Sequence, residues 1–136
     1  MNDHLRPNIF PAVRYADAAG AIDFLKRAFG ASEKSVHQRD GVIHHAELAL
    51  GAGLIMVGQY SEDGWLGGDP PRPRSSTVSV YVTIPDPDAH HAVALAAGAD
   101  VVRELEDMDY GSREYSVRDP EGNLWSFGTY DPYDYP

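Results

Sequence analysis

The stretch that decides the fold is residues 42–60, which read VIHHAELAL-GAG-LIMVGQY. Residues 42–50 alternate apolar and polar side chains at their end, which is typical of a strand with one buried face. The Gly-Ala-Gly that follows predicts a turn into a second strand, residues 54–58. The pattern Leu-x-x-x-Gly-x-Tyr at residues 54–60 returns at residues 124–130. The chain therefore contains two copies of one structural unit.

The predicted elements follow the same order in both copies. Residues 11–60 predict a strand, an Ala-rich helix and three further strands, and residues 79–130 repeat that order. Gly30 and Gly98 close the two helical stretches at nearly the same offset as the two Leu-x-x-x-Gly-x-Tyr patterns. One βαβββ unit cannot bury its own sheet face alone. Two copies, within one chain or across a dimer, are therefore expected to enclose a cavity.

This repeat divides the chain into modules. The first module is predicted to span residues 1–60 and the second residues 77–136, with a Gly- and Pro-rich connector loop at residues 61–76.

Each module is predicted to contain one helix. Asp17 is expected to cap a helix over residues 18–29, whose apolar residues recur at helical spacing. The second helix is predicted to open within residues 85–88, where proline and acid suit a first turn, and to continue over residues 89–97. His90 and His91 on it are expected at its surface, because adjacent helical residues point about 100° apart and cannot chelate one ion.

Composition excludes several classes of function. The formal net charge of −10 argues against a nucleic-acid partner and is compatible with a cationic ligand. The chain has no cysteine, which excludes disulfides, thiolate metal sites and cysteine nucleophiles. The sequence has no apolar run of membrane-spanning length and no signal-peptide pattern, so we expect a cytoplasmic protein without a membrane partner.

Residues 110–125, YGSREYSVRDPEGNLW, closely resemble the vicinal oxygen chelate superfamily, and the Asp-Pro-x-Gly-x-x-Trp turn is its commonest signature. That superfamily includes glyoxalase I, bleomycin resistance proteins, fosfomycin resistance enzymes and extradiol dioxygenases. The first predicted helix resembles the same group. The resemblance implies an α+β fold in which two βαβββ modules form a cup-shaped, partly open mixed β-sheet with helices on the outside. It also implies a homodimer.

Enzymes of this superfamily usually bind a divalent metal through His and Glu on the first and last strands of the modules. In this chain the matching positions are Phe10, Met56, Thr77 or Ser79, and Ser126. Phenylalanine cannot ligate a metal, and thioethers and hydroxyls are poor ligands for hard or borderline divalent ions. We therefore predict that the usual metal site is absent.

A displaced site remains open. His45 and Glu47 lie two residues apart on a predicted strand and share a face, so they could share a divalent metal or act as an acid–base pair. A solvated polar pair is the plainer interpretation.

Without a metal, the cup must bind by stacking, apolar contact and a few polar groups. Tyr115 is placed on the same face as His45 because the two positions match at the offset of the repeat, whereas Trp125 and Phe127 are expected in the core. Trp65 is either a stacking lid or an anchor for the connector, and Arg113 either binds ligand or pairs with an acid. The predicted ligand-binding residues are His45, Glu47, Met56, Trp65, Ser79, Tyr81, Arg113, Tyr115 and Ser126.

Two functions follow. The favoured one is a binding protein of the antibiotic-resistance type, without a cofactor, that holds a small aromatic or cationic molecule. The alternative is a metal-dependent lyase or dioxygenase that uses His45 and Glu47. The residues do not identify the ligand.

Overall fold

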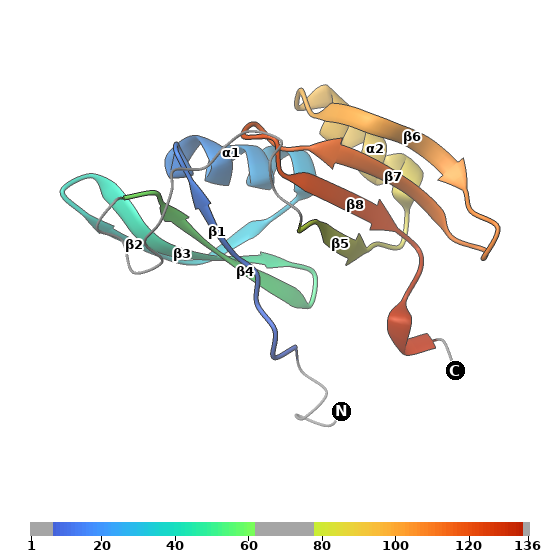
Figure 1. Ribbon diagram of the computed structural model, residues 1–136, viewed down its shortest axis with the longest axis horizontal. Coiled ribbons are helices and arrows are strands. Elements are labelled where there is room, and N and C mark those ends of the chain that lie inside the picture. Colours follow the sequence, from blue (N-terminus) through green and yellow to red (C-terminus); the bar gives the residue numbers. More distant parts are fainter. Residues whose placement is uncertain (1–6, 62–77, 135–136) are drawn as a thin grey trace. The chain divides into compact units, whose positions relative to one another are not determined.

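The computed structural model describes residues 7–61 and 78–134 (Figure 1). Within them the predicted repeat is confirmed, because each half runs strand, helix and three strands. None of the helices in these ranges is long and apolar enough to cross a membrane. The elements are β1 (Ala12–Tyr15), α1 (Ala18–Phe29), β2 (Ser32–Arg39), β3 (Val42–Leu50), β4 (Gly53–Gln59), β5 (Val80–Thr83), α2 (Pro87–Ala96), β6 (Asp100–Asp107), β7 (Arg113–Arg118), β8 (Leu124–Gly128) and the single 3₁₀ turn η2 (Pro132–Asp134).

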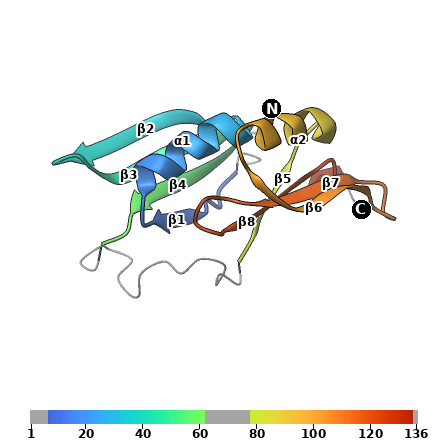
Figure 2. The same ribbon diagram turned by 90° about the horizontal axis from the view of Figure 1, so that it is seen from above.

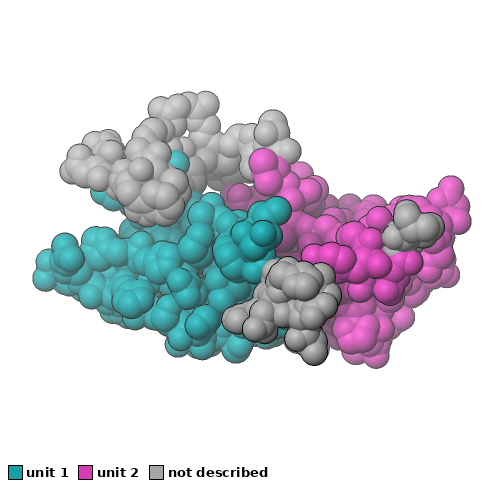
Figure 3. All heavy atoms as spheres, turned by 90° about the horizontal axis from the view of Figure 1, so that it is seen from below, with its two compact units in different colours: residues 1–26, 30–71 teal, residues 27–29, 72–136 magenta. Residues whose placement is uncertain are grey.

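The strands form two mixed sheets of identical topology. The first has the order β1-β4-β3-β2 and the second the order β5-β8-β7-β6. In each, the first strand runs parallel to its neighbour and the remaining pairs are antiparallel. The chain divides into two compact units (Figure 3), one of residues 1–26 and 30–71 and the other of residues 27–29 and 72–136. The last turn of α1 thus belongs to the second unit.

Helix α1 begins and ends as the sequence predicts. The Asp17 carboxylate accepts a hydrogen bond from the Gly20 amide at 3.0 Å, which satisfies one free amide of the first turn. Figure 2 shows α1 lying along one face of the first sheet. Its apolar stripe, with Leu25 fully buried, lies on the same side as the buried β3 residues Ala46 and Leu48. Alternation along β3 therefore places its odd-numbered residues on the opposite face.

Aromatic rings fill the core of the second unit. Trp125 and Phe127 are buried, as predicted from their alternation with Ser126. Phe29, from the last turn of α1, packs against them with ring centroids 5.2 Å and 4.7 Å away. Ala94 of α2 is fully buried.

Helix α2 begins within residues 85–88, as the sequence predicts. Its N-cap is Asp86, whose carboxylate accepts from the Ala89 amide at 3.1 Å, and Pro87 occupies the first turn. Proline suits this position because its missing amide would have no partner there.

The turn between β7 and β8 is organised by one buried carboxylate, Asp119. It accepts from the amides of Glu121 and Asn123, from the Asn123 side chain, and from the indole Nε1 of Trp125 at 3.1 Å. The Asp-Pro-x-Gly-x-x-Trp pattern is thus the signature of a turn that fixes the core tryptophan.

The two hairpins differ in the length of their turns. In the first, Leu50 pairs with Gly53, so two residues connect β3 and β4. In the second, Arg118 pairs with Leu124, so five residues connect β7 and β8. This difference decides which residue of β7 corresponds to each residue of β3.

Candidate functional site

The candidate site comprises the two sheet faces that point away from the helix of the same unit. We define the first distal face by Ala12, His45, Glu47, Leu54 and Met56, and the second distal face by Tyr81, Thr83, Glu114, Ser116 and Ser126. The members of each face come from neighbouring strands, since Glu47 pairs with Met56 and Met56 with Ala12. Correspondingly, Ser116 pairs with Ser126 and Ser126 with Tyr81.

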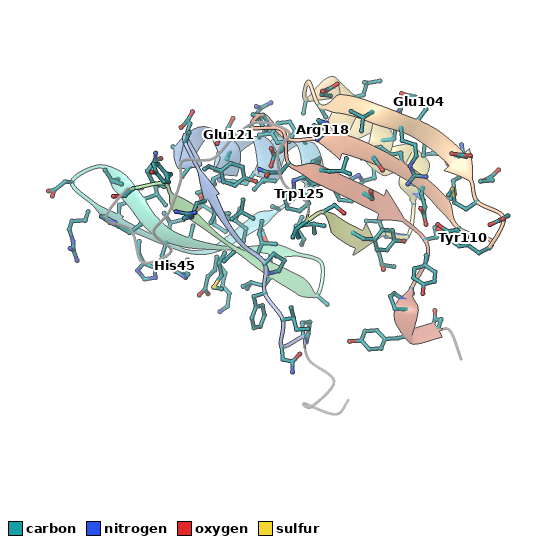
Figure 4. The ribbon with its side chains drawn as sticks, in the orientation of Figure 1. His45, Glu104, Tyr110, Arg118, Glu121 and Trp125 are labelled. Carbon is teal, nitrogen blue, oxygen red and sulfur yellow. The ribbon has the colours of Figure 1, made fainter. Side chains whose placement is uncertain are left out.

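The first distal face carries a hydrogen-bonded pair. His45 Nε2 lies 3.1 Å from Glu47 Oε2, and both side chains are about one-third exposed. This hydrogen bond lowers the pKa of Glu47 from its ordinary value. The His37 ring on β2 lies 6.0 Å from that of His45. Figure 4 shows His45 on the side of the sheet away from α1. The structure therefore brings together the predicted residues His45, Glu47 and Met56.

The donor set of the superfamily's metal site does not fit the residues present. Met56 and Ser126 lie on the two distal faces, in the middle of strands β4 and β8, and neither is a favourable ligand for a hard divalent ion. Phe10 is 41% exposed and supplies no donor atom. Across residues 7–61 and 78–134, no three His, Asp or Glu side chains are grouped so that they could hold a metal ion.

The second distal face carries a hydroxyl pair and an anchored tyrosine. The Ser116 and Ser126 hydroxyl oxygens lie 2.8 Å apart. Tyr81 donates its hydroxyl to the Tyr130 carbonyl at 2.8 Å, and Thr83 donates to the same oxygen. Partial burial raises the pKa of Tyr81, so its hydroxyl stays protonated near neutral pH. Tyr81 and Ser126, both predicted as ligand-binding residues, thus share this face.

Glu114, which no sequence pattern indicated, is the central group of the second distal face. Its side chain is almost fully buried. One carboxylate oxygen accepts from Arg103 Nη2 at 3.2 Å and the other from the Tyr110 hydroxyl at 2.9 Å. The hydrogen bond to this carboxylate raises the pKa of Tyr110. Arg103 also donates through Nε to the Ser116 hydroxyl, which links the carboxylate to the hydroxyl pair.

A glycine makes room for this group. A Cβ at position 128 would lie 2.4 Å from Glu114 Cγ and 2.9 Å from the Tyr81 hydroxyl. Both side chains therefore cross over β8 where it has no side chain of its own. Because glycine also costs backbone entropy in a strand, its presence here is explained by this close approach.

The predicted face of Tyr115 is wrong. Tyr115 is fully buried on the α2 side of the sheet, where its hydroxyl hydrogen-bonds to His90 Nδ1, and burial raises its pKa. Ser126 lies 70 residues after Met56, which is the offset of the repeat. Their strand partners, Ser116 and Glu47, lie only 69 residues apart. Such a slip moves a side chain to the other face.

The structure also corrects the predictions for Arg113 and His90. Arg113 lies on the α2 side of β7 and forms ion pairs with Asp88 and Asp107, each at 3.1 Å, which raise its pKa. Of the two roles considered, the structure places it in the ion pair. His90 is not a surface residue, since its ring lies 4.2 Å from that of Phe127, and burial lowers its pKa.

Ser79, predicted as a ligand-binding residue, adds little to either face. Ser79 is exposed and precedes the first residue of β5. Trp65 and Thr77 lie outside the described residues.

The chain matches known proteins over nearly its whole length. The family model of the Glyoxalase/Bleomycin resistance protein/Dioxygenase superfamily matches residues 3–127. Uncharacterized proteins of Mycobacterium bovis and Mycobacterium tuberculosis are 37% identical to it over 138 residues, which cover 94% of this chain and 86% and 77% of theirs.

Solved structures agree with the family match. The crystal structure of TioX from Micromonospora sp. ML1 is 35% identical, with a TM-score of 0.74 over 90% of this chain and 94% of that one. The fosfomycin resistance protein FosX from Listeria monocytogenes is 14% identical, with a TM-score of 0.69 over 93% and 95%, and shares the fold. The chain therefore belongs to the Glyoxalase/Bleomycin resistance protein/Dioxygenase superfamily.

Proposed function

We propose that this chain binds a small aromatic or cationic organic molecule on the distal faces of its sheets and uses no metal to do so. The observation that carries the proposal is the chemistry of those faces. The positions that match the superfamily's metal ligands hold Met56 and Ser126. Carboxylates, tyrosines and hydroxyls from neighbouring strands lie beside them. Such a surface supports contact and hydrogen bonding better than coordination.

Aromatic and cationic ligands fit these side chains better than anions. Met56 offers a polarizable thioether, which contacts aromatic rings favourably, and Tyr81 offers a ring that is one-third exposed. Glu47 and Glu114 place a carboxylate on each face, and the net charge of −10 attracts cations at long range. We propose that the protein sequesters a toxic compound, because the superfamily includes bleomycin resistance proteins.

A binding screen tests this function. Untagged, ¹⁵N-labelled protein is titrated with a panel of neutral aromatic, cationic aromatic and anionic aromatic compounds, and amide shifts are followed by NMR. The proposal expects saturable shifts on β4, β5 or β8 with the cationic or neutral compounds. Absence of saturable shifts across the panel overturns it.

A metal-dependent activity at His45 and Glu47 is the second candidate, and the 3.1 Å contact between them favours it. Two side chains are fewer than the three protein ligands of typical catalytic zinc sites. Elemental analysis of untagged protein, after incubation with zinc, nickel, manganese and iron and then desalting, tests it. Near one metal per chain, lost in Glu47→Ala, would support the candidate. No retained metal would leave the binding function.

A homodimer and a cytoplasmic location also remain predictions. Sedimentation equilibrium would measure the first and cell fractionation the second.

A further inference from the structure

Three tyrosines lie at the end of the second distal face where β7 begins and β8 ends. We define them as the tyrosine cluster: Tyr81, Tyr110 and Tyr130. Tyr110 comes from the turn between β6 and β7 (Figure 4), and Tyr130 follows β8. The Tyr130 ring lies 6.1 Å from Tyr81 at 65° and 5.9 Å from Tyr110 at 84°. Both pairs of rings thus pack edge to face, so the rings present their faces in different directions.

The cluster is held in place before any ligand arrives. The Tyr130 carbonyl accepts hydrogen bonds from the hydroxyls of Tyr81 and Thr83, and its amide donates to the Ser112 hydroxyl at 3.0 Å. Tyr110 is fixed through its hydroxyl to Glu114. Fixed rings lose little conformational freedom on binding, which favours affinity.

The cluster is also accessible, and the chain segments that carry it are rich in carboxylates. Tyr81 is 36% exposed and Tyr110 is 45% exposed. The segment of residues 103–114 carries five carboxylates and two arginines, and both arginines already form ion pairs with carboxylates. Asp131 directly follows Tyr130. Aromatic faces and carboxylates attract cations, above all weakly hydrated alkylammonium groups.

We infer that the tyrosine cluster, with Glu114 behind it, is a binding site for an alkylated ammonium group. The inference rests on the proposed function, because it names the ligand class that the second distal face takes. The ammonium contacts the exposed tyrosine rings, and the Glu114 carboxylate orients the Tyr110 ring by accepting its hydroxyl. A guanidinium or a bare metal ion would need to contact the Glu114 carboxylate directly, but Arg103 already forms an ion pair with it.

A matched pair of probes tests the inference. Choline and 3,3-dimethylbutan-1-ol have nearly the same shape, but only choline carries a positive charge. Each is titrated into ¹⁵N-labelled protein, and amide shifts of residues 110, 128 and 130 are followed. We expect choline to produce saturable shifts there and the neutral alcohol to produce none. Equal binding of both probes, choline shifts confined to other residues, or no choline shifts would each overturn the inference.

Variants separate the rings from the rest of the surface. Tyr110→Leu removes one exposed ring in a turn and is expected to weaken choline binding about fivefold to tenfold. Tyr133→Leu is the matched control, because Tyr133 is 85% exposed and, within the described residues, has no ring contact with the cluster. Glu114→Gln should weaken choline but leave neutral aromatic compounds unaffected. Unchanged choline affinity in Tyr110→Leu overturns the inference.

The compound panel tests the proposed function, and the choline titration tests the inference. If panel compounds bind on either distal face while choline does not, the inference is wrong and the proposed function stands. If no compound of the panel binds, the proposed function is wrong as well.

Discussion

The hairpins β3–β4 and β7–β8 occupy the same place in their sheets, yet they present different chemistry. The first distal face carries the partly exposed His45–Glu47 pair, and the second carries the buried Glu114 network. By pairing, Ala46 corresponds to Tyr115, so the residues just before them, His45 and Glu114, also correspond. One position of the fold thus holds a solvated imidazole in one unit and a buried carboxylate in the other.

The difference shows how a repeat diverges without losing its fold. The helix side is similar in both hairpins, because Ala46 and Leu48 of β3 and Tyr115 and Val117 of β7 are all fully buried. The distal side does not have to fill a core, so it can change its chemistry. A ligand-binding function is expected to develop on such a side.

The largest expected effect comes from breaking the turn that distinguishes the second hairpin. Asp119→Ala removes the acceptor for two amides and leaves the Trp125 indole N–H buried without its partner. We expect the free energy of unfolding to fall by about 3 kcal/mol, because hydrogen bonds to a charged, buried group are strong. Urea denaturation measures the loss.

The control for this variant lies in the first unit. Asp17→Ala removes the N-cap of α1, whose carboxylate accepts from the Gly20 amide, and should cost about 1 kcal/mol. A loss at Asp119 no greater than at Asp17 would contradict the importance given to the turn.

A smaller effect is expected at the two corresponding glycines, Gly58 and Gly128. A Cβ at 58 would lie 2.8 Å from the His44 carbonyl oxygen, and one at 128 would meet the side chains of Glu114 and Tyr81. Both alanine variants should destabilise the protein by about 1–3 kcal/mol, because overpacking forces strain. Thermal unfolding measures this.

The two glycine variants differ in what else they change. Gly128→Ala pushes directly on the tyrosine cluster and should reduce choline binding, whereas Gly58→Ala acts on backbone in the first unit and should not. Equal choline affinity in both variants would break the assignment of the site to the second face.

Much of the fold could be predicted because local signals agreed. Helix α1 was predicted with its bounds because its apolar spacing, Asp17 cap and terminal Gly30 all indicate the same segment. The faces of β3 followed from alternation that ends in a short, recognisable turn. Trp125 and Phe127 were placed in the core for the same reason.

The second distal face was harder to predict because its register depends on distant contacts. The two Leu-x-x-x-Gly-x-Tyr patterns give the correct offset between β4 and β8. The turn around Asp119 has a different length from its counterpart, so the offset between β3 and β7 is one residue shorter. Applying the first offset to β7 therefore placed Tyr115 on the wrong face. Glu114 was missed because its partners Arg103 and Tyr110 lie on β6 and the following turn. Charge pairing across strands leaves no periodic pattern in the sequence.

The smallest expected effect is a pH dependence confined to the second unit. Burial lowers the pKa of His90 below its ordinary value of 6.5, so the unfolded chain binds this proton more tightly than the folded one. The stability that comes from neutral His90 is therefore present above pH 6.5 and is lost as the pH falls from there toward the lower pKa of the folded state. Urea denaturation between about pH 7.5 and about pH 5 should show this slope, and His90→Gln should flatten it.

The lowered pKa of Glu47 acts in a separate window, since its ordinary value is 4.5 and its contribution is lost only as the pH falls below that value. A slope that Glu47→Gln removes and His90→Gln leaves intact would assign the pH dependence to the first unit instead.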